Sequence, residues 1–245
     1  MAVESRKSMV VIAAHTGDYV WRCAGAIALH VKLGYRVVVI CLSYGERGES
    51  ARLWRQGKVL GEIKDIRRQE AEDAAKVLGA QLRTFDAGDY PLVETPELLY
   101  GLVALYRETQ PTVVLTHPER DPYNFDHPIA FHLAMKARIL AQAPGVEPGG
   151  TPLGAPPVFC FEPHQSEMCD FKPDLLLDIT EVWERKRQAM HMMAGQQHLW
   201  QYYTDVAARR GTQLVRNSSA NLGHQTTVKG EAYQRVYPTV AREFA

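Results

Sequence analysis

The sequence predicts an α/β fold, an open and mostly parallel sheet with helices on both faces, and three observations support this. Short apolar, β-rich runs alternate with segments of helical spacing over residues 1–120. These runs carry no regular polar alternation, which is typical of parallel strands buried on both faces. Polar loops follow the runs, at the edge where such sheets place their binding sites, at 15–19, 43–50 and 117–127.

Local residue patterns set the bounds of the expected elements. Strands are expected where β-branched and aromatic residues gather, at 9–14, 35–43, 81–86, 112–117 and 158–163. Helices are expected where apolar residues recur every three or four positions, at 20–33, 63–78, 95–109, 128–141, 178–197 and 198–211. Gly34 and Gly79 follow two of these helices as stop signals. The Pro- and Gly-rich stretch 142–157 is expected to be an exposed loop, and the polar chain after Gly211 fits no pattern.

Composition narrows the class of protein. The 245 residues are expected to form a single domain, 1–245. Lys plus Arg and Asp plus Glu number 28 each, so no overall field attracts nucleic acid or an anionic membrane. No stretch is typical of a signal peptide or a membrane span, and the four cysteines lack CxxC spacing. We therefore expect a cytoplasmic protein without a nucleic-acid or membrane partner; a local cationic pocket for a small anion and homo-oligomerisation stay open.

The first strand ends in a pair of potential metal ligands. His15 and Asp18 leave this strand together, so both side chains can converge above the sheet. A neutral imidazole and a carboxylate suit catalytic Zn²⁺, which takes three protein ligands and keeps one position open. The loop after the fourth strand offers a third ligand among His117, Asp121, Asp126 and His127. We favour His127, which stands where a new helix begins; the plainer alternative is that His15 only caps a helix or forms a hydrogen bond.

Three short motifs resemble the LmbE/PIG-L-like zinc proteins. They are A-H-T-G-D at 14–18, S-Y-G-E-R-G at 43–48 and D-H at 126–127. The resemblance implies a Rossmann-like fold that binds zinc. It also implies that the zinc ligands are His15, Asp18 and His127. Most members of this family are deacetylases that act on N-acetylglucosamine-type substrates.

Two departures from the deacetylase pattern weaken that activity here. The deacetylases usually carry A-H-P-D-D, whose first aspartate is the general base, and this chain has Gly17 at that position. They also usually carry H-P-D-H, whose first histidine stabilises the oxyanion, and this chain has Asn124 there. Loss of a general base commonly costs about two to four orders of magnitude in rate. The strand end therefore keeps the metal ligands and lacks the hydrolytic base.

Longer stretches resemble a hydratase branch of the same family, which acts in the degradation of gallate and protocatechuate. The stretches are GERGES, DPYNFDHP, GAPPVFCFEPHQ and MAGQQHLWQYYT. This resemblance implies addition of water to a conjugated tricarboxylate. Two alternatives stay open: a zinc-dependent N-deacetylase in which another group replaces the base, and a catalytically inactive metal-binding or ligand-sensing module.

Hydration of an electron-poor alkene needs a base for the water and a proton donor for the neighbouring carbon. Glu46 is the candidate base, because its loop leaves the second strand beside the metal ligands; Glu49 is the second choice. His164 ends a β-rich run at the same edge and can act as the acid or hydrogen-bond a substrate carboxylate. The plainer alternative is that these side chains only stabilise their loops.

A substrate with three carboxylates also needs cationic and polar groups. Arg47 and Arg120 lie on the two loops that flank the ligands and can bind carboxylates bidentately. Tyr123 and Asn124 can hydrogen-bond the substrate from the ligand loop. Asp126 is expected to support the metal site from its second shell by orienting the loop around His127.

Overall fold

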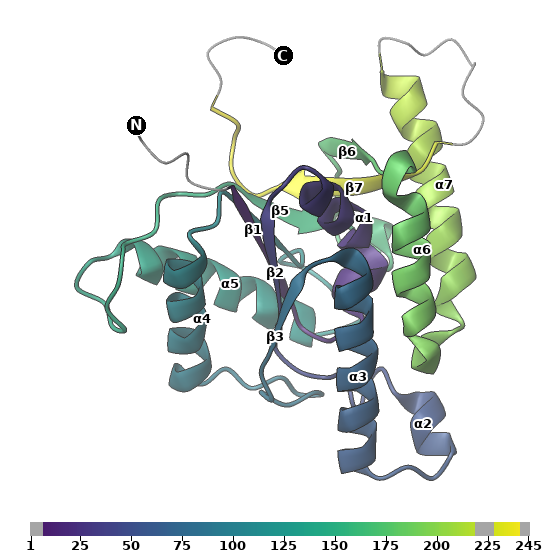
Figure 1. Ribbon diagram of the computed structural model, residues 1–245, viewed down its shortest axis with the longest axis horizontal. Helices are drawn as coiled ribbons and strands as arrows, with labels where there is room; N and C mark the ends of the chain where they lie inside the picture. Colours follow the sequence, from purple (N-terminus) through teal and green to yellow (C-terminus); the bar gives the residue numbers. More distant parts are fainter. Residues whose placement is uncertain (1–6, 219–227, 241–245) are drawn as a thin grey trace.

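One sheet runs through the molecule, and helices lie against both of its faces (Figure 1). The computed structural model describes residues 7–218 and 228–240. Across the sheet the strand order is β3-β2-β1-β4-β5-β7-β6. The strands are β1 (Ser8–Ala13), β2 (Arg36–Cys41), β3 (Gln81–Thr84), β4 (Val113–Thr116), β5 (Val158–Phe161), β6 (Leu175–Asp178) and β7 (Gly230–Arg235).

The first five strands are parallel, which confirms the predicted fold class. β1 pairs with β2 on one side and β4 on the other, and β3 and β5 extend this parallel block. β7 then runs antiparallel between β5 and β6. The sequence analysis predicts β1 to β5 but neither β6 nor β7. For β7 the reason is that Gly230–Arg235 is mostly polar and has no apolar run to mark it as a strand.

The helices form two layers, one on each face of the sheet. α4 and α5 cover one face, and α1, α3, α6 and α7 lie on the other (Figure 1). β1 belongs to both cores, since Val10 and Ile12 pack on the α4–α5 side and Met9 and Val11 pack on the opposite side. The helices are α1 (Asp18–Lys32), α2 (Ala51–Arg55), α3 (Leu60–Leu78), α4 (Pro96–Thr109), α5 (Asp126–Gln142), α6 (Trp183–Met192) and α7 (Leu199–Asn217).

The single helix expected over 178–197 is wrong. Asp178 ends strand β6, a short 3₁₀ turn covers Thr180–Val182, and α6 ends at Met192. Met193, with φ −83° and ψ 61°, leaves the helical region, and in the 3₁₀ turn that follows the N–H of Gly195 donates to the carboxylate of Glu70 at 2.7 Å. Helical structure resumes in α7, which extends beyond the stripe expected from the sequence, and α2 is also absent from the sequence prediction.

The loops at the carboxyl edge of the parallel strands bring distant parts of the chain together. Residues 14–17 follow β1, 42–50 follow β2, 85–95 follow β3 and 117–125 follow β4. Three of these are the polar loops in which the sequence places the site, and the third strand adds one more. Within the described residues, no helix is both long and apolar enough to cross a membrane.

Candidate metal centre and catalytic site

A tight turn between β1 and α1 holds His15 and Asp18 together. Asp18 is the first residue of α1, and its carboxylate accepts the backbone N–H of His15 at 2.8 Å. The same carboxylate oxygen lies 3.3 Å from Nδ1 of His15. Both side chains are buried. The three-residue spacing therefore places an imidazole and a carboxylate side by side at the end of β1.

His127 approaches the same carboxylate from the first turn of α5. Its Nδ1 donates to the Asp121 carboxylate at 2.7 Å, and its Nε2 lies 3.4 Å from Oδ1 of Asp18. Nε2 of His127 and Nδ1 of His15 are both buried and have no hydrogen-bond partner among the described residues. Together with Glu49, these side chains offer ligand atoms within 4.8 Å of one another. Two unpartnered imidazole nitrogens that face one carboxylate fit a divalent cation.

The other nitrogen of His15 faces two further carboxylates. Nε2 lies 3.2 Å from Asp126 and 3.2 Å from Asp89. Asp126 also accepts the backbone N–H of Tyr90 at 3.0 Å, and Asp89 accepts that of Gly48 at 2.9 Å. These bonds connect the loops after β2 and β3 to the imidazole. The sequence prediction includes Asp126 and misses Asp89, because DAGDYP reads only as a loop.

The centre carries an excess of negative charge. Burial lowers the pKa of the His15 imidazole, but the surrounding carboxylates outweigh burial and raise that pKa well above 6.5. These carboxylates belong to Glu49, Asp126, Asp18 and Asp89. Four carboxylates gathered around one imidazole are surroundings that fit a divalent cation.

His117 lies beside the candidate ligands without joining them. Its Nε2 accepts the backbone N–H of Ala14 at 3.0 Å, and its ring stacks on His127 with the centroids 4.1 Å apart. Burial and the neighbouring His127 lower the pKa of His117 to about 3, so its imidazole is neutral. His117 therefore satisfies the backbone N–H at the end of β1 and packs against the ring of His127.

Of the two candidate bases, the structure places Glu49 rather than Glu46 beside the ligands. Oε1 of Glu49 lies 3.3 Å from Nδ1 of His15, and its Oε2 lies 3.4 Å from the buried guanidinium of Arg67. The carboxylate of Glu46 is buried and makes one ion pair within the described residues, with Lys64 at 3.6 Å. Glu46 accordingly faces α3, whereas Glu49 faces the candidate metal centre.

The predicted substrate-binding residues are distributed around the centre rather than within it. Arg47 is exposed and its guanidinium donates to the backbone of Asp89 at 3.2 Å. Arg120 is exposed and forms an ion pair with Asp170, and Tyr123 is also exposed. The side-chain oxygen of Asn124 accepts the backbone N–H of Asp126 at 3.0 Å, so Asn124 stabilises the start of α5. None of these four joins the group of candidate ligands among the described residues.

His164 follows β5 and packs against α7. Its ring stacks on Tyr202 with the centroids 4.3 Å apart, and its Nδ1 lies 3.5 Å from the Tyr203 hydroxyl. Burial and then the positive charge of Arg22 lower the pKa of His164, while Glu49 raises it slightly. The imidazole is thus within electrostatic reach of the centre and is neutral near pH 7.

Known proteins of one family match the chain over most of its length. The family model "PIG-L: GlcNAc-PI de-N-acetylase" matches residues 10–138. The chain belongs to the PIG-L family.

Both hydratases and deacetylases are found among its relatives. A 4-oxalmesaconate hydratase of Pseudomonas putida is 52% identical over 241 residues, which cover 98% of this chain and 93% of that protein. The crystal structure of GalB, the 4-carboxy-2-hydroxymuconate hydratase of Pseudomonas putida, matches with a TM-score of 0.93 and 51% identity and covers 98% of this chain and 100% of that one. A diacetylchitobiose deacetylase of Thermococcus kodakarensis is 27% identical over 215 residues, 82% of this chain and 76% of that protein.

Position 17, which carries the aspartate base in the deacetylase pattern of the PIG-L family, has no room for a side chain here. A Cβ on Gly17 would lie 2.6 Å from Oε1 of Gln196, 2.9 Å from Nε1 of Trp21 and 3.2 Å from Nη2 of Arg67. These groups hold one another, since Gln196 accepts from Arg67 at 2.9 Å and from Trp21 at 3.3 Å. The deacetylase base is therefore absent, and a hydrogen-bonded network fills its place.

Proposed function

We propose that this PIG-L family member is a hydratase that adds water to 4-oxalomesaconate, giving 4-carboxy-4-hydroxy-2-oxoadipate in gallate and protocatechuate degradation. The observation that carries this proposal is the 52% identity with the Pseudomonas putida hydratase over 98% of the chain. The filled space at Gly17 supports it against the N-deacetylase alternative, because a hydrolase of the family pattern needs a carboxylate there.

The proposed cofactor is Zn²⁺, held by His15, Asp18 and His127. Two imidazoles and one carboxylate are a common ligand set of catalytic zinc. Asp126 and Asp121 support the set, since each accepts a hydrogen bond from the nitrogen of a ligand imidazole that faces away from the metal. When bound, zinc lowers the pKa of water to about 7 and so provides a nucleophile at neutral pH.

Glu49 is the proposed general base. In the reaction, the oxygen of water bonds to one alkene carbon, and one proton of that water passes to the Glu49 carboxylate. Arg67 fixes this carboxylate at 3.4 Å and is itself held by Glu70 at 2.7 Å. Arg67 therefore holds the Glu49 carboxylate beside the candidate metal centre. Glu46, the first choice from the sequence, points to Lys64 instead.

His164 is the proposed proton donor to the second alkene carbon. Its lowered pKa keeps the free imidazole neutral. A bound tricarboxylate brings negative charge beside it and raises that pKa, so the imidazole becomes protonated when substrate is present. The proton that leaves the water is thus balanced by one delivered to carbon.

The remaining proposals concern the substrate and the cell. Arg47, Arg120 and Tyr123 contact the tricarboxylate from the exposed loops, and Asn124 contributes its free amide N–H groups.

We also infer a cytoplasmic location. The four cysteines are free thiols, as is typical of proteins in a reducing compartment.

The proposal is tested by ultraviolet absorbance. Enzymatically generated 4-oxalomesaconate is mixed with the purified protein, with and without a chelator. Hydration removes the conjugated double bond, so absorbance should fall, and the chelator should prevent the fall. His127→Ala should lose both metal and activity, whereas His132→Ala, an exposed histidine on the same helix, should keep both. A constant absorbance with metal-replete protein rejects the hydratase, and acetate release from N-acetylated sugars then becomes the next assay.

A further inference from the structure

Arg22 is a buried cation beside the candidate metal centre, and no hydrogen bond joins its side chain to the other described residues. It stands one helical turn after Asp18 in α1, and its Nε lies 3.3 Å from Oδ1 of Asp18. The residue is only 7% exposed. Nε and Nη1 are buried and have no hydrogen-bond partner within the described residues. Apart from this ion pair with Asp18, the buried donors of Arg22 are unsatisfied, which is costly to the fold and is explained by a ligand that accepts their hydrogen bonds.

The other buried arginines show that this fold normally satisfies such groups. Arg67 donates to Glu70 at 2.7 Å, and Arg138, which is 7% exposed like Arg22, donates to the carbonyl of Pro156 at 2.9 Å. The described residues contain five buried arginines, and four of them donate hydrogen bonds to protein groups. Those four are Arg67, Arg107, Arg138 and Arg210.

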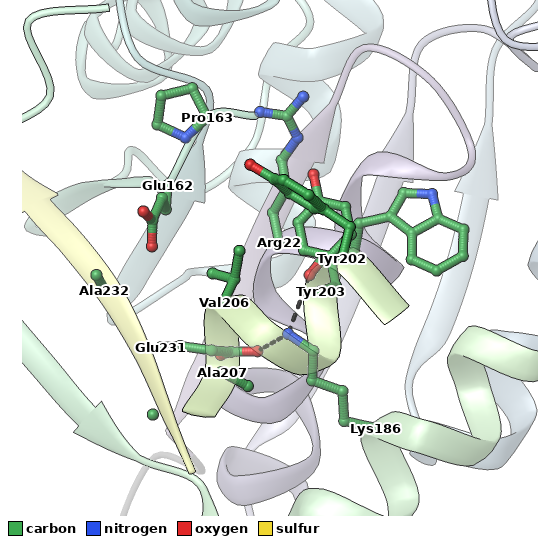
Figure 2. Close-up of a pocket in the computed structure, with 12 residues that line it drawn as sticks. Arg22, Glu162, Pro163, Lys186, Tyr202, Tyr203, Val206, Ala207, Glu231 and Ala232 are labelled. Carbon is green, nitrogen blue, oxygen red and sulfur yellow. Dashed lines mark hydrogen bonds and ion pairs between the residues drawn. The ribbon is translucent and has the colours of Figure 1, made fainter. Parts of the chain in front are cut away.

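A break in α1 fixes the position of Arg22 without using its guanidinium. Cys23 has non-helical dihedral angles, φ −140° and ψ 16°. Lys186 donates to the carbonyl of Trp21 before the break at 3.0 Å, and Glu231 accepts the backbone N–H of Gly25 after it at 2.8 Å. Lys186 and Glu231 pair at 2.7 Å, and the Arg22 side chain points away from this pair (Figure 2). The fold therefore holds the stem of Arg22, while Nη1 of its guanidinium is buried and has no hydrogen-bond partner among the described residues.

The Arg22 guanidinium lies near residues at the end of β5, beside the candidate metal centre. It lies 6.0 Å from the ring centroid of Phe161, the last residue of β5. Its charge also acts on His164, the proposed proton donor, which follows the same strand. One edge of the guanidinium thus faces Asp18, a proposed metal ligand, and the group is close enough to His164, the proposed proton donor, to lower the pKa of that imidazole.

We propose that Arg22 is a carboxylate-binding residue: its two Nη groups take one carboxylate of a tricarboxylate ligand bidentately, while Nε stays beside Asp18. The identity of the ligand rests on the proposed function. Arg22 then orients the substrate between the metal centre and His164, a role that the sequence assigns to the exposed Arg47 and Arg120. The competing interpretation is that Arg22 only neutralises Asp18.

Binding of tricarballylate to the metal-replete protein separates the two interpretations. This saturated tricarboxylate cannot be hydrated, so calorimetry reports binding alone. Arg22→Met should weaken binding by about 30-fold or more, because a buried charge-assisted pair is lost. Arg22→Lys keeps the charge without the bidentate geometry and should give an intermediate loss. Arg138→Met, equally buried but remote from the centre, should leave affinity unchanged.

Kinetics and metal content complete the test. Arg22→Met should raise KM for 4-oxalomesaconate far more than it lowers kcat, with unchanged zinc content. The proposal is overturned if Arg22→Lys and Arg22→Met bind tricarballylate with wild-type affinity, or if the wild type does not bind it. It is also overturned if the variants lose zinc while their affinity for tricarballylate is unchanged, because Arg22 would then be only a structural partner of Asp18. Should Arg22→Met fail to fold, Arg22→Lys alone decides. Arg22-dependent binding in a protein that does not hydrate 4-oxalomesaconate rejects the proposed function and retains the carboxylate site.

Discussion

Nδ1 of His127 donates to the carboxylate of Asp121 at 2.7 Å, and this bond determines which nitrogen of the ring is free. Because the carboxylate accepts, Nδ1 carries the hydrogen and Nε2 keeps its lone pair. Nε2 has no hydrogen-bond partner in the described structure and lies 3.4 Å from Asp18. Asp121 is therefore the group that leaves Nε2 of His127 available as the proposed metal ligand.

Asp121→Ala should lower the affinity for zinc by about 10- to 100-fold, because the ring loses its orientation and its fixed tautomer. Competition with a chelating dye measures this affinity. Glu119→Ala, an exposed carboxylate of the same loop, is the matched control and should bind zinc normally. Equal affinities in the two variants would remove Asp121 from the support of the metal centre.

Gly17→Ala should destabilise the protein by about 1–3 kcal/mol, as overpacking of a tight site typically does. The new Cβ would lie 2.6 Å from Oε1 of Gln196, so this amide must shift, and the shift would disturb its hydrogen bonds to Arg67 and Trp21. Urea unfolding measures the loss. Gly61→Ala meets nothing within 4 Å in helix α3 and should instead be neutral or stabilising. Similar unfolding curves for the two variants would show that position 17 has room after all.

Glu49→Gln should retain zinc and lose about two to four orders of magnitude in turnover, since the amide cannot accept the proton of water. Glu46→Gln should change turnover much less, because its carboxylate faces Lys64. Zinc content and kcat are measured for both variants. The reverse order of effects would return the role of base to Glu46 and leave Glu49 as a ligand or a loop residue.

The pH dependence of stability reports on His164. Burial, and then Arg22, lowers the pKa of its imidazole from 6.5, so the unfolded chain binds this proton more tightly than the folded chain. Stability therefore falls as pH drops below 6.5. His164→Asn should flatten this fall. The free energy of unfolding of the wild type and of His164→Asn is measured above and below pH 6.5, with a chelator present so that loss of metal affects neither protein. If the two free energies change with pH in parallel, His164 has an ordinary pKa in the folded state.

Local patterns predict much of this molecule, and long-range pairing accounts for what they miss. Apolar periodicity predicts the buried strands and most helices. The HxxD spacing at the end of one strand predicts that the side chains of His15 and Asp18 lie together. Asp89 carries no such signal, because its partner His15 lies far away in the sequence and only the folded sheet brings them together. Arg22 resembles any polar residue of a helix until the burial of its guanidinium is known.

Long-range pairing also explains why the sequence analysis misses strand β7. Glu231 is 4% exposed, and a buried glutamate in a short polar segment gives no strand signal. Its carboxylate accepts the N–H groups of Gly25 and Ala26, which follow the break in α1, and forms an ion pair with Lys186. The partners that keep Glu231 buried in β7 therefore lie far away in the sequence. The choice of Glu49 over Glu46 is similar: both lie on one loop, and Arg67 of α3 decides which carboxylate faces the centre.

Removal of one partner of the Lys186–Glu231 pair should be strongly destabilising. Both side chains are nearly fully buried and 2.7 Å apart, so Lys186→Met leaves an unpaired carboxylate in the core, at a cost of about 3–5 kcal/mol. Glu231→Gln keeps an acceptor for the N–H of Gly25 but leaves the Lys186 ammonium without a counter-charge, with its hydrogen bond to the carbonyl of Trp21. Urea unfolding of both variants and the double variant measures the coupling of the two side chains. A double variant less destabilised than the sum of the singles is expected; simple additivity would mean that each side chain stabilises its half of α1 independently.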